Sequence, residues 1–348
     1  MNFKKKIFSI LSKKEFYNLT WDIFRYQIKN NKIYKNYLQY LEVNPFEIKN
    51  ISKIPFLPIS FFKTHRILSS CNTTRTGDCY DIIFTSSGTT PGIRSQHYVK
   101  SLSVYIESII KSFEFFYGSI EKFKFLGFFP TDRKDSSLIY MVKHLIQKTY
   151  QNGSHFVPFP YSSNNYNKDI HLIPNRNNKN IFIFGLSFFL LDFIEKYNYL
   201  IPFSFKKKEY QNKVIIMETG GMKGKRKEII REELHNKLKN FFCVKDIHSE
   251  YGMTELLSQA YAKKNGIFQC PPWMKIYIRD PEDPFIHIDN NKIGGIDIID
   301  LSNYLSCPFI STQDLGKKIN ENEFEVLGRM DFSDMRGCNI MTPHFLES

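Results

Sequence analysis

Short apolar runs alternate with longer amphipathic stretches from Asp81 onward. The strands of a sheet and the helices that cover it produce this pattern. We therefore predict an α/β fold in which helices cover a sheet. The predicted strands cover residues 82–85, 123–129, 181–184, 214–218 and 244–248, and the predicted helices cover residues 98–116, 136–147, 187–197 and 227–241.

The N-terminal part has a purely helical period. Apolar positions recur at helical spacing over residues 15–41, which predicts one or two amphipathic helices. Two prolines in residues 54–60 predict an extended connector, because proline interrupts a helix. We expect residues 1–80 to form a helical cap with this connector.

The distal part is predicted to be rich in β structure. After about Tyr261 the helical period stops, and the short apolar runs at 273–278, 295–299 and 324–327 are typical of strands. We expect residues 81–348 to form the main domain, with this β-rich segment at its end.

The composition is that of a globular protein. Hydrophobic residues make up 42% of the 348 residues and charged residues 24%, which excludes a disordered or coiled-coil chain. The 48 Lys and Arg exceed the 35 Asp and Glu by 13, a charge that can attract nucleic acid. However, the basic runs are short and no nucleic-acid motif accompanies them. We expect no nucleic-acid partner. An ordinary solvated basic face is the expected reason for the charge, and a surface that docks an acidic partner is the alternative.

Two further features concern location and metals. No apolar run approaches the roughly 18 residues of a membrane helix, so we expect a cytoplasmic protein that is not transmembrane. The six cysteines form no Cys-x-x-Cys pair, which predicts reduced thiols without a zinc site or a disulfide framework.

A segment rich in small hydroxyl residues follows the predicted strand 82–85. Hydroxyl and backbone N–H groups around a glycine can surround phosphate oxygens. The segment lacks the Gly-Lys-Ser/Thr of a Walker A loop, and an ordinary polar turn is the alternative. Its candidate phosphate-binding residues are Thr85, Ser86, Ser87, Gly88, Thr89, Thr90 and Arg94.

Three more segments could complete a nucleotide site. After the predicted strand 244–248, Tyr251 offers a flat face, Gly252 permits a tight turn, and Thr254 with Glu255 supplies oxygen ligands for phosphate and Mg²⁺. The alternative is a loop that leads into a helix capped by Thr254. Asp314 can accept both hydroxyls of a ribose, and Arg329 can contact the same sugar or a phosphate.

In this order, the four segments resemble the motifs of the adenylate-forming, AMP-binding enzymes. A closer resemblance is to the acyl-protein synthetase family, the LuxE-type component of the bacterial fatty-acid reductase complex. The residues that carry it are Ile54-Pro-Phe-Leu-Pro58, Met217-Glu-Thr-Gly-Gly221, Ser249-Glu-Tyr-Gly-Met-Thr-Glu255, Leu327-Gly-Arg-Met-Asp331 and Arg336-Gly-Cys-Asn339. The resemblance implies ATP-dependent activation of a fatty acid to an acyl-adenylate, followed by acyl transfer to a protein thiol.

The resemblance also implies roles for individual residues. Thr85 to Thr90 would bind the β- and γ-phosphates, and Gly220 and Gly221 would form a wall for adenine. Tyr251 would pack near adenine, Thr254 would contact the α-phosphate, and Glu255 would hold Mg²⁺. Asp314 would bind the ribose hydroxyls, with Arg329 close by. ATP and Mg²⁺ are the implied cofactors, and a reductase-like protein or an acyl carrier protein is the implied partner.

The chain departs from the general family pattern at two places. The usual lysine after the phosphate loop is replaced, and Arg94 is the nearest cation. Only seventeen residues follow Asp331, so we expect the C-terminal lid domain and its lysine to be absent.

The acyl acceptor stays open between three alternatives. Cys338 beside Arg336 is the candidate within the chain, because a nearby cation lowers a thiol pKa; the alternative is an ordinary buried cysteine. A carrier-protein or coenzyme A thiol is the second possibility, and a non-catalytic scaffold subunit of a lipid or pigment pathway is the third. The chain length of the acid, and whether it is aliphatic or aromatic, also stay open.

Histidines and one apolar helix give weaker indications. His248 lies next to the proposed site and is the best functional candidate among the histidines, whereas a local hydrogen bond is the expected role of His97. The apolar residues of the predicted helix 187–197 could line an acyl tunnel, although a helix face of this kind is more often core.

Overall fold

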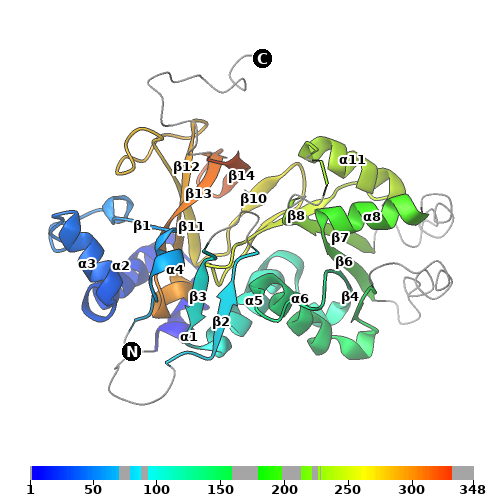
Figure 1. The fold of residues 1–348 in the computed structure, drawn as a ribbon, viewed down its shortest axis with the longest axis horizontal. Helices are drawn as coiled ribbons and strands as arrows, with labels where there is room; N and C mark the ends of the chain where they lie inside the picture. The colour runs from blue at the N-terminus through cyan, green and yellow to red at the C-terminus, as the bar shows by residue number, and fades with distance from the viewer. Residues whose placement is uncertain are drawn as a thin grey trace.

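A computed structural model of the chain describes residues 2–69, 79–87, 93–158, 179–197, 213–221, 226–227 and 229–330. Among these residues, twelve strands form one sheet in the order β11-β12-β13-β14-β10-β9-β8-β7-β6-β4-β5, with β1 beside β13 (Figure 1). A separate hairpin joins β2 (Ile82–Thr85) to β3 (Gln96–Val99). The predicted α/β class is confirmed.

One half of the sheet is parallel and covered by helices. Its strands read as continuous apolar runs because both faces are buried. The residues of β4 are all buried, and six of the seven in β6 are. The strands are β4 (Phe123–Phe128), β5 (His155–Phe156), β6 (Asn180–Leu186), β7 (Val214–Thr219) and β8 (His248–Tyr251). The helices are α5 (Leu102–Tyr117), α6 (Ser137–Lys148), α8 (Ser187–Tyr197) and α11 (Arg231–Phe242), with 3-10 turns at Ile120–Lys122 and Tyr150–Asn152.

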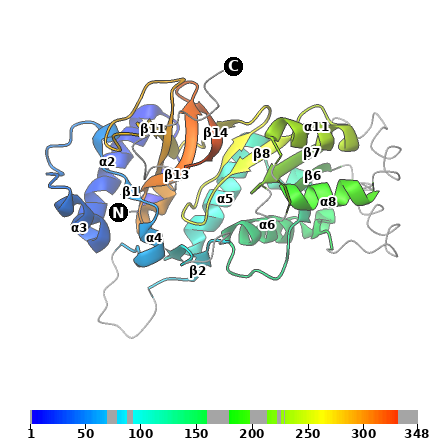
Figure 2. The same cartoon turned by 45° about the horizontal axis from the view of Figure 1, so that its top comes forward.

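The other half is antiparallel and lies against the N-terminal helices (Figure 2). Its strands are β9 (Ala260–Ala262), β10 (Ile267–Gln269), β11 (Met274–Arg279), β12 (Ile293–Asp300), β13 (Phe309–Lys318) and β14 (Glu323–Arg329), with a 3-10 turn at Leu301–Leu305. The N-terminal elements are α1 (Phe3–Ile7), α2 (Lys13–Asn30), α3 (Lys32–Tyr40), a 3-10 turn at Ile51–Lys53, β1 (Leu57–Pro58) and α4 (Phe61–Thr64).

The N-terminal helices share one hydrophobic core with the antiparallel strands. Phe24 of α2 packs edge-on against Phe309 of β13, with 5.8 Å between ring centroids. The connector contributes β1, which pairs in parallel with β13. The boundary near residue 80 stays a prediction, while the helices predicted within 15–41 are confirmed as α2 and α3. A capping box between Ser12 and Glu15 begins α2.

Two predicted elements are misplaced. The helix predicted from residue 98 begins at Leu102, because Gln96–Val99 instead pairs with β2. The strand predicted over 244–248 begins only at His248, because α11 ends at Cys243 in a left-handed conformation and Ile247 is buried without joining the sheet. Residues 163–180, whose mostly polar sequence predicts a surface loop, lie largely outside the described residues.

Membrane and cysteine expectations can be compared with the same residues. None of the helices in the described part of the chain has the length and apolar character that a membrane span requires. Cys243, Cys270 and Cys307 are free thiols. The expectation of reduced thiols is wrong for Cys79, which is disulfide-bonded.

Candidate active site

The candidate site lies at one edge of the sheet. Strands β7 and β8 are parallel neighbours, with Met217 opposite His248, so the loops that follow them leave the same edge. Gly220 and Gly221 follow β7, and the segment from Gly252 to Glu255 follows β8. Ligands of open α/β sheets bind outside the carboxyl ends of the strands, which is where these loops lie.

Tyr251, Asp314 and Arg329 form the contact that joins the two halves of the sheet at this edge. The Tyr251 hydroxyl donates to Asp314 Oδ2 at 2.8 Å, and Arg329 Nε lies 3.7 Å from Asp314 Oδ1. Asp314 and Arg329 are directly opposite in the β13–β14 pairing. Burial raises the pKa of Asp314, while the Tyr251 hydrogen bond and the Arg329 charge oppose that rise.

Glu255 is a second buried carboxylate of the site. Its side chain is almost fully buried, and burial raises its pKa above the ordinary 4.5. A hydrogen bond from Ser95 and the charge of Arg329 favour the ionised form, whereas the negative charge of Asp314 disfavours it. Glu255 therefore lies within electrostatic reach of the Asp314–Arg329 pair.

The β2–β3 hairpin places the first predicted phosphate-binding residues beside this edge. Ser86 N–H donates to the Ser95 carbonyl at 3.1 Å, and Ser95 N–H donates to Ser86 Oγ at 3.1 Å. Ser95 also bonds to Glu255, so the hairpin is tied directly to the loop after β8. Ser87 and Arg94 are exposed, and Gly88, Thr89 and Thr90 lie outside the described residues.

Arg133 and Asp135 hold Thr85 at the end of β2, where the hairpin loop begins. Neither residue was predicted from the sequence. The Thr85 hydroxyl donates to Asp135 Oδ2, and Thr85 N–H donates to the Asp135 carbonyl at 2.8 Å. Arg133 Nη2 donates to the Thr85 carbonyl at 3.1 Å and also pairs with Asp135 at 3.0 Å. The signal available in the sequence was the polar segment 131–135 directly after a predicted strand, which is where site loops of such sheets begin.

His97 reaches the site, contrary to its expected local role. Its Nδ1 lies 2.9 Å from the Thr254 carbonyl oxygen and its Nε2 lies 2.9 Å from Ser306 Oγ. Burial lowers its pKa to about 4, so the ring is neutral at neutral pH. The preferred candidate, His248, instead lies at the opposite end of β8, with its Nδ1 3.0 Å from the Tyr117 hydroxyl.

The two glycines after β7 leave a bare strip of backbone. Gly220 and Gly221 have φ values of +76° and +56°, which favour glycine, and a Cβ at Gly221 would meet open space. The preceding Thr219 hydroxyl donates to Glu250 Oε2 at 2.5 Å, which fixes this loop to β8. A flat ring could lie against such a strip without meeting side chains.

Glu218, inside β7, has a different environment from the site carboxylates. Its oxygens accept hydrogen bonds from Ser187 at 2.8 Å and Ser249 at 2.6 Å, and His235 Nε2 lies 3.4 Å away. Burial alone would raise its pKa, but these neighbours outweigh burial and the pKa lies below 4.5. Glu218 thus ties together α8, β8 and α11.

The described residues fit a magnesium nucleotide better than a protein-enclosed metal. Among them, no three His, Cys, Asp or Glu side chains gather as ligands. Mg²⁺ in nucleotide sites typically takes one or two carboxylates and completes its shell with phosphates and water. Glu255, buried and short of hydrogen-bond donors, is suited to be such a carboxylate.

Two remaining features lie away from this site. A cavity of about 370 Å³ opens between α1–α2 and the β10–β11 region and contains none of the predicted site residues. In α8, Phe189, Leu190, Leu191 and Phe193 are buried in the main core, so the core alternative to an acyl tunnel is confirmed for them. Cys338 lies outside the described residues.

Solved structures share the fold of this chain. The chain is similar to 2-hydroxyisobutyryl-CoA ligase in an open conformation with 2-HIB-AMP and CoA (10% identity, TM-score 0.64, 91% of this chain and 70% of that one). It is also similar to ATP-bound MatB from Rhodopseudomonas palustris, with 15% identity and a TM-score of 0.51 over 75% of this chain and 50% of that one. A third similar structure is O-succinylbenzoate coenzyme A synthetase from Bacillus subtilis with ATP and magnesium, with 17% identity and a TM-score of 0.50 over 75% of this chain and 53% of that one. The chain therefore spans about half the length of the last two. These similarities confirm the predicted adenylate-forming fold; the predicted absence of a lid concerns the chain beyond Met330 and stays a prediction.

Sequence comparison identifies the family. No curated protein sequence matches the chain significantly. The family model of "Acyl-protein synthetase, LuxE" matches residues 9–345, which is nearly the whole sequence. The chain therefore belongs to the LuxE acyl-protein synthetase family.

Proposed function

We propose that the protein activates a fatty acid with ATP to form an acyl-adenylate and then transfers the acyl group to a protein thiol. The observation that carries the proposal is the convergence of Glu255, Asp314 and the β2–β3 hairpin at one sheet edge. Family membership and similarity to structures described with ATP, magnesium, an acyl-AMP and CoA support it.

In the first step, a carboxylate oxygen of the acid attacks the α-phosphorus of ATP, and the bond to pyrophosphate breaks. Catalysis of such a displacement rests on positioning and on neutralising charge. Thr85, Ser86 and Ser87 begin the loop proposed to hold the leaving pyrophosphate, and Thr254 is proposed to contact the α-phosphate. Mg²⁺, when bound through Glu255, would neutralise phosphate charge.

The nucleoside would be held beside Tyr251. Asp314 is proposed to accept the ribose hydroxyls on Oδ1, because Oδ2 already accepts from Tyr251. Arg329, whose side chain is 81% exposed, is free to move toward the sugar or a phosphate. Gly220, Gly221 and Gly252 are proposed to border the adenine, and the space beside Gly221 is open.

In the second step, a thiolate attacks the acyl carbonyl carbon and AMP leaves. The described cysteines are poor candidates for this thiol. Burial raises the pKa of Cys270 and, to about 12, that of Cys307. Cys243 follows α11 and precedes the amino end of β8, whereas the site segment follows the carboxyl end of that strand. We therefore retain Cys338 as the proposed acceptor, before transfer to a reductase-like or acyl carrier protein.

Transfer to coenzyme A or directly to a carrier protein is the second candidate. The net charge of +13 favours it, since a basic surface would attract an acidic carrier or a phosphate-rich cofactor. In that case AMP release would depend on the added acceptor, and no acyl group would stay on the protein.

ATP–pyrophosphate exchange that depends on a carboxylic acid tests the first step. A panel of aliphatic acids of increasing length and aromatic acids should give exchange with at least one fatty acid. No exchange with any acid, in protein shown to be folded, would contradict the proposal and support a scaffold subunit.

Intact-protein mass spectrometry tests the acceptor. After incubation with ATP, Mg²⁺ and the best acid, we expect a mass increase of one acyl group that hydroxylamine removes. Cys338→Ala should lose this label and keep the exchange activity. A label that survives the substitution would remove Cys338 from the mechanism, and exchange without any label would favour an external thiol.

A further inference from the structure

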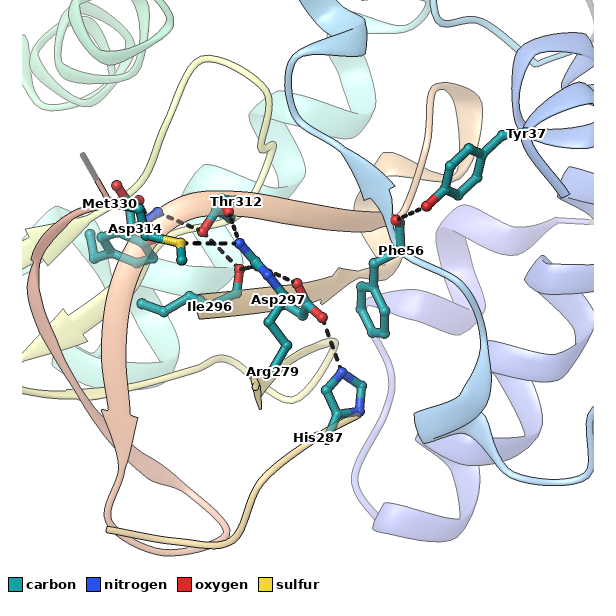
Figure 3. Close-up of polar contacts among 10 residues, drawn as sticks. Tyr37, Phe56, Arg279, His287, Ile296, Asp297, Thr312, Asp314 and Met330 are labelled. Carbon is teal, nitrogen blue, oxygen red and sulfur yellow. Dashed lines mark hydrogen bonds and ion pairs between the residues drawn. The ribbon is translucent and has the colours of Figure 1, made fainter. Parts of the chain in front are cut away.

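A buried ion pair lies behind the segment that carries Asp314. Arg279, the last residue of β11, is 7% exposed, and its Nη1 donates to Asp297 Oδ1 at 2.7 Å and to the Ile296 carbonyl at 3.2 Å (Figure 3). Its Nη2 donates to the Thr312 carbonyl at 2.6 Å and contacts Met330 Sδ at 3.4 Å. One guanidinium thus holds β12, β13 and the residue that follows β14.

The backbone is shaped to let this guanidinium cross the sheet. Gly295 lies directly opposite Arg279, and a Cβ at Gly295 would be only 2.4 Å from the guanidinium carbon. The pairing of β12 with β13 is irregular between Gly295 and Asp297. Glycine is therefore required at this position for the arginine to pass over β12 and reach β13.

Thr312 connects the ion pair to Asp314. Its carbonyl accepts from Arg279, its hydroxyl donates to the Ile296 carbonyl at 2.7 Å, and the same hydroxyl accepts the Asp314 N–H at 3.1 Å. Thr312, two residues before Asp314, is thus held through both its carbonyl and its hydroxyl. Asp314 N–H is fixed as well, which leaves its carboxylate pointing to Tyr251.

The other end of the network is anchored in the core. Asp297 is 1% exposed, and its Oδ2 lies 3.0 Å from His287 Nε2. The His287 ring packs edge-to-face with Phe56, with 5.4 Å between ring centroids (Figure 3). It also stacks on Tyr277, with 4.8 Å between centroids, so aromatic groups fix its orientation. Asp297 is therefore held through both of its oxygens, one by Arg279 and one by His287.

Stability alone does not account for this arrangement. Desolvation of two buried charges largely cancels their attraction, and well-packed apolar residues often replace such a pair without loss of stability. What an apolar replacement could not supply is the set of directed hydrogen bonds that Arg279 makes to two strands. The charge of Arg279 also lowers the pKa of Asp314, against the effect of burial.

We propose that Arg279, Asp297 and Thr312 are positioning residues that fix Asp314 in the orientation for binding the ribose hydroxyls. The inference rests on the proposed function, because it takes Asp314 as the ribose ligand. These three residues touch neither sugar nor phosphate. They act through the backbone at 312–314, with Gly295 providing the space.

The test measures how strongly the protein prefers ATP to 2′,3′-dideoxy-ATP in equilibrium titrations. If two hydroxyls bind Asp314, the wild type should favour ATP by about 10-fold or more. Thr312→Val keeps the shape but removes the acceptor for the Asp314 N–H, and should reduce the preference to within about 3-fold. Thr312→Ser keeps the hydroxyl and should retain most of the preference.

Three further variants separate positioning from general loss of structure. Arg279→Met and Gly295→Ala should both weaken the preference for ATP, the second without removing any charge. In Asp314→Asn the preference should already be lost, so adding Thr312→Val should change nothing further. Leu145→Ala, which opens a cavity in α6 within the core of the parallel half, should lower the melting temperature and keep the preference.

Two kinds of result would overturn the inference, and they differ. A folded Thr312→Val or Arg279→Met protein with the wild-type preference would show that the network does not position Asp314, while the proposed function would stand. A wild-type protein that binds no adenine nucleotide, or binds both nucleotides equally, would instead remove the ribose role of Asp314 and the inference with it.

Discussion

Glu218 and Glu255 are both buried acidic side chains near one sheet edge, but their surroundings shift their pKa values in opposite directions. Glu218 has three hydrogen-bonding neighbours, Ser187, Ser249 and His235, and its pKa lies below the ordinary value. Such a carboxylate is ionised at neutral pH, and its donors belong to the protein itself. It stabilises the packing of the parallel half.

At Glu255 and Asp314 the pKa shift has the opposite direction. Burial raises the pKa of both side chains, although Ser95 and the Glu255 backbone oppose the rise at Glu255 and the Tyr251 hydroxyl opposes it at Asp314. Burial has the same sign in both regions; the hydrogen bonds from Ser187, Ser249 and His235 outweigh it at Glu218, whereas the neighbours of Glu255 and Asp314 do not outweigh it. A buried carboxylate with a raised pKa is a functional candidate, because a bound cation or a ligand hydroxyl can stabilise its ionised form.

The largest effect should come from Glu255→Gln. The variant keeps the shape and loses the charge proposed to hold Mg²⁺, so acid-dependent ATP–pyrophosphate exchange should fall by about 10²–10³-fold. Equilibrium unfolding should show no loss of stability at pH 7. Full exchange activity in the variant would refute the catalytic role of Glu255.

The pH dependence of Glu255→Gln has a defined sign. Because the folded-state pKa is raised, the ionised side chain destabilises the folded state once the pH exceeds the unfolded value near 4.5. The variant should therefore become more stable relative to wild type as the pH rises from 4 toward 7. Urea unfolding at both pH values measures this difference. An opposite trend would contradict the shift.

Glu218→Gln should give the reverse result. Its amide group cannot accept from all three neighbours, so the free energy of unfolding at pH 7 should fall by about 1–3 kcal/mol. Because the folded-state pKa is lowered, wild type has its advantage above pH 4.5 and loses it as the pH falls through the folded pKa. Exchange per folded molecule should change far less than in Glu255→Gln. Equal stability of the two proteins at pH 7 would contradict the structural role.

Parts of this site that are local in the sequence could be predicted from it. Tyr251, Thr254 and Glu255 form one short motif. The parallel strands could be predicted from their apolar runs, because both faces of these strands are buried. The helix boundary at Leu102 was missed because Gln96–Val99 is defined by its pairing with β2, which periodicity alone does not reveal.

Residues that support the site through tertiary contacts could not be predicted. His97 contacts Thr254, which is 157 positions later in the chain, and no spacing rule links them. Arg279 is an ordinary strand residue in the sequence, and its role depends on the glycine opposite it and on the order of three strands. The sequence therefore indicates the ligands of the site more clearly than the residues that orient them.

His97→Leu should produce a moderate and specific effect. It leaves the Thr254 carbonyl without the imidazole, so the KM for ATP in the exchange reaction should rise by about 10-fold, the effect of roughly one hydrogen bond. His248→Leu is the matched control, because His248 is also largely buried but bonds to Tyr117 at the other end of β8.

Stability does not distinguish these two histidine variants. Burial lowers the pKa of both rings to about 4, so in the wild type each ring destabilises the folded state as the pH falls below about 6.5. Each variant should therefore lose less stability than the wild type as the pH falls. Only the KM for ATP separates them. An equal rise in KM in both variants would contradict a specific role of His97.

The smallest effect is expected from Arg133→Met, which tests whether the start of the phosphate loop needs to be held. Arg133 and Asp135 are partly exposed, so the ion pair itself contributes little, and the relevant contact is the hydrogen bond from Arg133 to the Thr85 carbonyl. Its loss should raise the KM for ATP about 3-fold and leave the KM for the acid unchanged. Arg25→Met, which breaks an exposed pair with Asp22 on α2, should change neither constant. If Arg133→Met behaves like this control, Asp135 alone suffices to hold Thr85, and the hairpin is fixed mainly through Ser95 and its bond to Glu255.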